Sequence, residues 1–185
     1  MMLTELKNWL KSEAKDKSIF DIVVYGSVAK GKYHPRDIDI AVIFRTGSLE
    51  ERLNKIQKIK KKIPIKNIDI KALLWEELFQ EEFFARSGIF LEGISVINGE
   101  HFAKRLGFSG GILFIYNLKN KTHTEKVKFN YLLSGRTSSG IVGKLNGKQI
   151  SPGVVKIPIQ NSFEFEQILI SHHISFTKEA ILTQD

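Results

Sequence analysis

Cysteine is absent from the sequence, and so is any long hydrophobic run. The lack of cysteine excludes disulfides, thiolate catalysis and cysteine-based zinc sites. No apolar stretch approaches the roughly 20 residues that span a bilayer, and charged residues interrupt the N-terminal segment where a signal peptide would have its apolar core. These absences predict a cytoplasmic protein that has no membrane partner.

Several common catalytic signatures are missing as well. The sequence contains no P-loop, dinucleotide-binding fingerprint, nucleophile elbow or HExxH motif. Any enzymatic activity must therefore come from another arrangement of side chains.

The composition is that of a globular protein with a basic surface. Apolar residues make up 42% and charged residues 26% of the 185 residues, which is enough chain for one large domain or two small ones. The formal charge of +8 is spread out, with 19 basic and 15 acidic residues in 1–106 and 9 and 5 in 107–185. This charge permits a nucleotide, RNA or acidic protein partner, and it equally fits a plain soluble surface.

Apolar periodicity divides the first half into alternating helices and strands. We expect strands at 19–25, 37–44 and 65–75, and helices at 3–14, 49–63 and 75–86, with Ser48 as the N-cap of the second helix. This alternation predicts an α/β (α+β) domain over residues 1–106.

The second half reads as a separate small α/β domain of unknown role, residues 107–185. GFSGG at 107–111 is interpreted as a hinge, and the elements that follow give the order βαββαβ of ferredoxin-like modules. The glycine-rich stretch 134–153 is interpreted as a flexible connector, or alternatively as a loop that contacts RNA or substrate.

Two aspartates mark the second predicted strand. Asp37 and Asp39 are two residues apart, so their side chains point to the same face, and two like charges so close require a cation between them. Mg2+ prefers such carboxylate ligands. Asp69, flanked by isoleucines on the next predicted strand, would be a third carboxylate, and together the three could hold two metal ions.

The turn before these acids offers a phosphate-binding site. Gly26 allows a sharp turn and close backbone approach to a ligand, and Ser27 adds a hydroxyl and an N–H group. Lys30 would add a cation one turn later.

Gly26-Ser27-x-Ala29-x-Gly31 followed by Asp37-Ile38-Asp39 resembles the signature of the DNA polymerase β-type nucleotidyltransferase superfamily, in particular its minimal nucleotidyltransferase branch. The resemblance covers roughly residues 3–105. It implies a small mixed sheet with helices packed on one side, two Mg2+ ions, and ATP or another nucleoside triphosphate as donor. It assigns Gly26 and Ser27 to the triphosphate and Asp37, Asp39 and Asp69 to the metals.

Simpler interpretations of the same residues stay open. Asp37 and Asp39 could face solvent, Asp69 could pair with Lys66 or Lys71, and Lys30 could be a solvated lysine. Arg36 could either pair with Asp37 or reach a phosphate, and His34 could be plain surface.

Two functions follow from these residues. The first is an Mg2+-dependent nucleotidyltransferase that moves a nucleoside monophosphate, AMP from ATP, onto a hydroxyl of a protein or RNA acceptor. The resemblance implies a helical partner protein of the toxin–antitoxin type. The alternative is an inactive binding module that keeps the fold and recognises nucleic acid or a protein.

Overall fold

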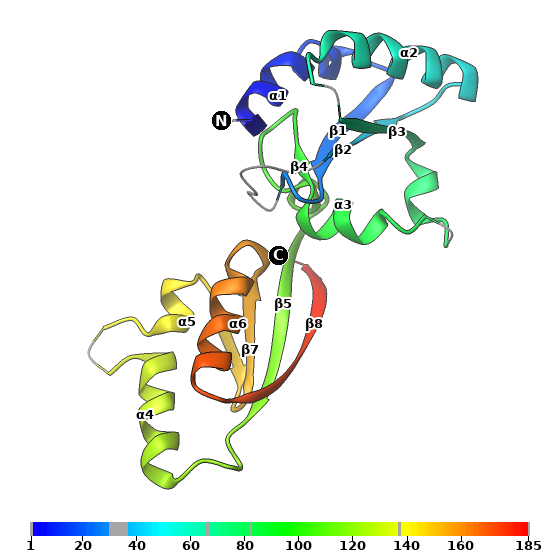
Figure 1. Cartoon of the computed structure of the whole chain (residues 1–185). Coiled ribbons are helices and arrows are strands. Elements are labelled where there is room, and N and C mark those ends of the chain that lie inside the picture. Colours follow the sequence, from blue (N-terminus) through cyan, green and yellow to red (C-terminus); the bar gives the residue numbers. More distant parts are fainter. Residues whose placement is uncertain (1, 30–36, 66, 82, 137, 185) are drawn as a thin grey trace. The chain divides into compact units, whose positions relative to one another are not determined.

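The computed structural model describes residues 2–29, 37–65, 67–81, 83–136 and 138–184. It divides into two compact units, Met1–Gly107 and Phe108–Asp185, each with its own sheet (Figure 1). Among the described residues, no helix has both the length and the apolar character needed to cross a bilayer.

The first unit alternates helices and strands around a four-stranded sheet. Its α-helices are α1 (Met2–Leu10), α2 (Leu49–Lys62) and α3 (Arg86–Glu92), and its 3-10 helices are η1 (Glu13–Lys15), η2 (Glu76–Phe79) and η3 (Phe102–Leu106). Its strands are β1 (Ile19–Tyr25), β2 (Ile38–Phe44), β3 (Ile68–Leu74) and β4 (Ile94–Ser95).

The sheet of this unit is mixed, with the strand order β3-β2-β1-β4. β1 pairs antiparallel with β2 and with β4, whereas β2 and β3 run parallel. A parallel pair needs a long crossover, and α2 supplies it. The predicted N-cap of α2 is confirmed, because the Ser48 side chain and that of Glu51 form a reciprocal capping box.

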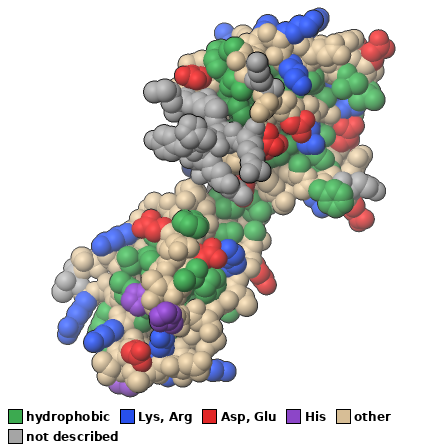
Figure 2. All heavy atoms as spheres, viewed as in Figure 1, with side chains coloured by type: hydrophobic (Ala, Val, Ile, Leu, Met, Phe, Trp, Pro, Cys, Tyr) green, Lys and Arg blue, Asp and Glu red, His purple; other side chains and the backbone are tan. Residues whose placement is uncertain are grey.

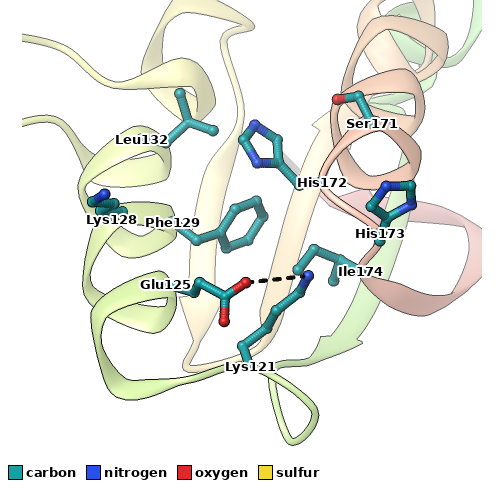
Figure 3. Close-up of a pocket in the computed structure, with 9 residues that line it drawn as sticks. All are labelled: Lys121, Glu125, Lys128, Phe129, Leu132, Ser171, His172, His173 and Ile174. Atoms are coloured by element: carbon teal, nitrogen blue, oxygen red, sulfur yellow. Dashed lines mark ion pairs between the residues drawn. The ribbon is translucent and has the colours of Figure 1, made fainter.

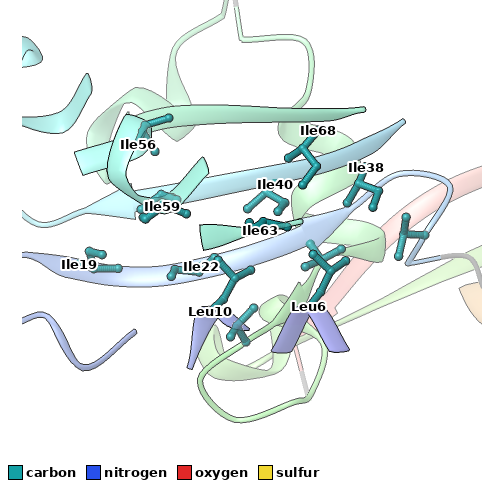
Figure 4. Close-up of a cluster of buried hydrophobic side chains, with 14 of the residues drawn as sticks. Leu6, Leu10, Ile19, Ile22, Ile38, Ile40, Ile56, Ile59, Ile63 and Ile68 are labelled. Carbon is teal, nitrogen blue, oxygen red and sulfur yellow. The ribbon is translucent and has the colours of Figure 1, made fainter. Parts of the chain in front are cut away.

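Helices cover both faces of this sheet. One face packs against α1 and α2 through Leu6, Leu10, Ile56 and Ile59, as Figure 4 shows. The other face, which carries Val23, Ala41 and Ile43, packs against residues of η2, α3 and η3. The expectation of helices on one side only is therefore wrong.

The predicted helix 75–86 is wrong as well. It is replaced by the short helix η2, a turn, and the start of α3 at Arg86. Glu77 turns back to accept a hydrogen bond from the Leu74 backbone N–H at 2.7 Å, and it forms a 2.8 Å ion pair with Arg52 of α2. These contacts favour a tight turn at the end of β3. Two aromatic side chains of this segment lie at the surface, since Phe84 is 91% exposed and Phe79 is 54% exposed.

The second unit confirms the βαββαβ order, with one additional short helix. Its strands are β5 (Phe108–Asn117), β6 (Lys148–Ser151), β7 (Val154–Pro158) and β8 (Ser175–Gln184), and its α-helices are α4 (His123–Ser134), α5 (Ile141–Lys144) and α6 (Ser162–Ser171), with the 3-10 helix η4 (Ile159–Asn161). The strand order is β6-β7-β5-β8, and every neighbouring pair is antiparallel. This is the split βαβ arrangement.

Two expectations for this unit are wrong. Residues 108–111 are not a hinge but the start of β5, paired with residues 181–184 of β8. The glycine-rich stretch is not a mere connector, because it contains α5 and β6 and places Val142 and Leu145 in the core beside Phe129 and Phe165.

Candidate functional site

Three polar side chains lie in one row across the sheet of the first unit. Tyr25 at the end of β1 is the register partner of Asp39 on β2, and Asp39 is the register partner of Asp69 on β3. Register partners in neighbouring strands lie roughly 5 Å apart and point to the same face. All three project on the face that carries Ala41 and Ile43, opposite to α1 and α2.

Asp37 lies next to this row. It directly precedes β2, two residues before Asp39, and its side chain is exposed. The alternation expected for this strand is confirmed, since Ile38, Ile40 and Val42 belong to the core on the other face. The sheet therefore gathers the three predicted acids on one side.

The turn after β1 closes against these acids. Gly26 has a φ of +71°, in the left-handed region, and a Cβ at this position would overlap a carboxylate oxygen of Asp39. The left-handed conformation disfavours a side chain, and a Cβ here would also require the Asp39 carboxylate to shift. The backbone of the turn thus lies directly beside the Asp39 carboxylate.

Two hydroxyls of this site are buried without a partner. Neither the Tyr25 hydroxyl nor the Ser27 hydroxyl has a hydrogen-bond partner among the described residues. A buried hydroxyl without a partner costs about 1–3 kcal/mol. Both hydroxyls thus have hydrogen-bonding capacity that no described residue uses.

The electrostatics show that the acids act on one another. Burial raises the pKa of Asp39, and the charges of Asp37 and Asp69 raise that pKa further, while Lys71 opposes them. Burial, together with the charges of Asp39 and Asp69, also raises the pKa of the Tyr25 hydroxyl. The site therefore concentrates negative charge, which a cation would relieve.

One cation already lies near the row. The ammonium of Lys71 is 3.5 Å from a carboxylate oxygen of Asp69, and both side chains are substantially exposed. This is the pairing that the simpler interpretation of Asp69 anticipated. Exposed pairs of this kind contribute about 0–1 kcal/mol, so Lys71 is not a fixed counter-ion.

The chemistry of these groups fits a hard divalent cation. Carboxylate and hydroxyl oxygens are what Mg2+ prefers, and the turn leaves room only for backbone beside Asp39. Within the described part of the chain, no three His, Asp or Glu side chains are already grouped closely enough to hold a metal ion. The side chains of Asp37, Asp39 and Asp69 would have to rotate toward one another.

Four sequence-predicted residues fall outside the described ranges. These residues are Lys30, His34, Arg36 and Lys66. The assignment of Lys30 to phosphate binding therefore stays a prediction.

Sequence reasoning missed the polar role of Tyr25. The sequence pattern places Tyr25 only at the end of an apolar strand. The one signal that it lies at the site is its position directly before Gly26. Acidic and basic side chains lie side by side on the face of this unit visible in Figure 2.

Asp21 is a second missed acid, and it has a different role. Its fully buried side chain accepts hydrogen bonds from Ser95 at 2.9 Å and from Arg105 at 2.8 Å. It lies on β1 four residues from Tyr25, so about 13 Å of strand separates the two. Asp21 therefore belongs to the packing of the unit rather than to the row of acids.

Comparisons with known proteins agree with the class of domain that this fold and site define. Residues 5–92 match the family described as "Polymerase beta, Nucleotidyltransferase", so this part of the chain is a nucleotidyltransferase domain of that family. The match contains the Gly26 turn and all three acids, and it supports nucleotidyl transfer at a general level.

The other comparisons add little to the family match. Among solved structures, a crystal structure of a mutant toxin–antitoxin pair, MntA-HpeT, matches at 16% sequence identity and a TM-score of 0.38. The match covers 56% of this chain and 77% of that one. No curated protein matches the sequence.

Proposed function

We propose that the first unit is an Mg2+-dependent nucleotidyltransferase that transfers a nucleoside monophosphate, AMP from ATP, to a hydroxyl group. The observation that carries the proposal is the row of Asp39 and Asp69 on paired strands with the Gly26 turn against Asp39. The general class of reaction comes from the family, and the donor, the metal and the residue roles are our inference.

The roles of the residues follow from their places in the site. Asp37 and Asp39 would hold the metal ions with Asp69, and the backbone of Gly26 with the Ser27 hydroxyl would bind the triphosphate. When bound, Mg2+ neutralises the phosphate charge and lowers the pKa of the attacking hydroxyl. The unpartnered Tyr25 hydroxyl could donate a hydrogen bond to a phosphate oxygen or to the acceptor.

The proposed transfer is a displacement at the α phosphorus of the nucleoside triphosphate. The acceptor oxygen forms a bond to that phosphorus, the bond to the bridging oxygen of the β phosphate breaks, and pyrophosphate leaves. The proton of the acceptor hydroxyl passes to a carboxylate of the site or to water. The acceptor, a protein partner of the toxin–antitoxin type or RNA, stays a prediction from the family resemblance.

The experiment incubates the full chain with α-labelled ATP, CTP, GTP or UTP and Mg2+ in the presence of total protein and RNA extracts. We expect label from ATP to appear on protein or RNA, and Asp39→Asn to abolish it, while Asp16→Asn, which changes an acid outside the site, leaves it unchanged. If no nucleotide is incorporated although Mg2+ and ATP bind, transfer is excluded.

One observation favours the alternative of an inactive binding module. Lys71 already pairs with Asp69, and its ammonium group lies where a metal ion bound to that carboxylate could otherwise lie. Under this alternative, neither the wild type nor Lys71→Ala would consume a nucleotide. Under our proposal, Lys71→Ala frees Asp69 and strengthens Mg2+ binding, which calorimetry can measure.

A further inference from the structure

The second unit contains a cavity of about 450 Å3 that is unrelated to the row of acids. It lies between the N-terminal part of α4 and the end of α6, and Figure 3 shows the side chains around it. Pockets for small organic ligands span roughly 300–1,000 Å3, so the cavity is large enough for one small molecule.

The inner wall of this cavity is apolar and partly aromatic. Phe129 is 4% exposed and Ile174 is 6% exposed, and both belong to the core of the unit. The ring of His172 packs edge-on against the ring of Phe129, with 5.5 Å between the centroids. A flat apolar group of a ligand could pack against this pair of rings.

The rim of the cavity is cationic. Lys121 and Lys128 line it from the side of α4, and His172 and His173 line it from the end of α6. Histidine side chains lie among Lys and Arg side chains on the face of this unit seen in Figure 2. Two ammonium groups and two imidazoles therefore line the same opening.

The one acid of the rim is already engaged. The Glu125 carboxylate accepts hydrogen bonds from the Thr122 N–H at 2.8 Å and from the Thr122 hydroxyl at 2.7 Å, as part of the cap of α4. These hydrogen bonds lower the pKa of Glu125. Lys121 forms an ion pair with this carboxylate at 3.9 Å (Figure 3), and because this distance is too long for a hydrogen bond, its N–H groups could still donate to a ligand.

His173 adopts a left-handed backbone conformation at the end of α6. His173 has a φ of +52°, and the Ile174 N–H donates to the Leu169 carbonyl at 2.9 Å, which closes the end of α6 in a Schellman motif. Glycine is the usual residue in this left-handed position, since a side chain there is strained. The chain nevertheless places an imidazole at the mouth of the cavity.

We propose that this cavity binds a small organic phosphate monoester with a flat apolar part. The phosphate would lie between Lys121 and Lys128 and the two imidazoles, and the apolar part would pack on Phe129 and His172. Two ammonium groups together with imidazole donors around one opening suit a dianion better than a singly charged carboxylate. The inference does not rest on nucleotidyl transfer by the first unit.

The first experiment is calorimetric titration of the full chain with phenyl phosphate, benzoate and inorganic phosphate. We expect phenyl phosphate to bind at least tenfold more tightly than either of the others. Lys128→Gln should weaken its binding about tenfold, whereas Lys148→Gln, which changes an exposed lysine of β6 in the same unit, should leave it unchanged. Equal affinity for phenyl phosphate in Lys128→Gln and in the wild type would overturn the proposal, as would no binding at all.

The second experiment separates binding from folding at His173. Replacing His173 by glycine should leave the melting temperature unchanged or raise it, because glycine accepts the left-handed backbone. The same substitution should weaken phenyl phosphate binding several-fold. Unchanged binding in a folded His173→Gly variant would show that the imidazole serves only the helix end, and the proposal would fail.

Discussion

At the scale of single residues, Gly26 is a position in the candidate site that favours glycine over any side chain. Its φ of +71° and its contact with the Asp39 carboxylate both require glycine. We expect Gly26→Ala to lower the free energy of unfolding by about 1–2 kcal/mol, and to lower nucleotidyl transfer by about 100-fold because the turn would move away from Asp39.

The matched control for this substitution is Gly107→Ala. Gly107 has a φ of +78°, but a Cβ there would meet no atom within 4 Å. The control should show a similar loss of stability and no loss of transfer. Equal activity losses in the two variants would mean that the Gly26 contact does not position the site.

Asp39 should destabilise the fold when no metal is present. Burial and the neighbouring carboxylates raise its pKa in the folded state, so its charged form is unfavourable at neutral pH and the penalty disappears as the pH falls and the carboxyl is protonated. With a chelator present, Asp39→Asn should therefore raise the free energy of unfolding at pH 7 by about 0.2–1 kcal/mol. The gain should vanish near pH 3.

Asp16 gives the opposite case in the same measurement. Hydrogen bonds from Lys55 and Ser18 lower its pKa to about 2, so its charge stabilises the fold above the ordinary pKa of an aspartate and the stabilisation is lost as the pH falls toward 2. Asp16→Asn should thus reduce stability at pH 7, where Asp39→Asn increases it. If Asp39→Asn were also destabilising in chelator, the repulsion among the acids would be negligible.

The acids show how far sequence reasoning reaches at this scale. The alternation of β2 placed Asp37 and Asp39 on one face, and the apolar neighbours of Asp69 marked it as unusual. The same rule would have selected Asp21, which pairs with Arg105 eighty-four residues along the chain. Only the folded chain separates an acid with a buried partner from one that lies beside other acids.

At the scale of secondary-structure elements, the Asp21–Arg105 pair ties η3 to β1. The Asp21 side chain is fully buried, whereas the Arg105 side chain is 26% exposed. Arg105→Ala would leave a buried carboxylate without its cation, so we expect a loss of about 3–5 kcal/mol at pH 7. Asp21→Ala should cost less, because the remaining guanidinium can reach water.

Denaturant titrations of the two variants at pH 7 and pH 4 check this order. Burial raises the pKa of Asp21, so protonation at the lower pH should restore part of the stability of Arg105→Ala and none of that of Asp21→Ala. A larger loss for Asp21→Ala than for Arg105→Ala at pH 7 would contradict the account.

Elements with strong local signals were predictable, and those set by distant contacts were not. The β-branched run of β1 and the capped, periodic α2 were predicted within one residue of their ends. The segment after β3 was read as one helix because its apolar residues recur at helical spacing. Its real shape depends on Arg52, which lies 25 residues away and holds Glu77.

At the scale of the whole molecule, the two units have separate hydrophobic cores. The cores of residues 1–107 and 108–185 are built from different side chains, and every residue of the proposed transfer site lies in the first unit. We expect the two fragments, expressed separately, each to unfold cooperatively in thermal melts followed by circular dichroism. A fragment without a cooperative transition would show that its core depends on the other unit.

Under the proposed function, the parallel pairing of β2 with β3 also determines when the site can form during synthesis of the chain. A ribosome-bound chain that has emerged only as far as α2 already contains the Gly26 turn and Asp39, but it lacks the strand that carries Asp69. Nascent chains of that length would be chemically silent. Under the proposed function, transfer would become possible only once β3 has left the exit tunnel and paired with β2.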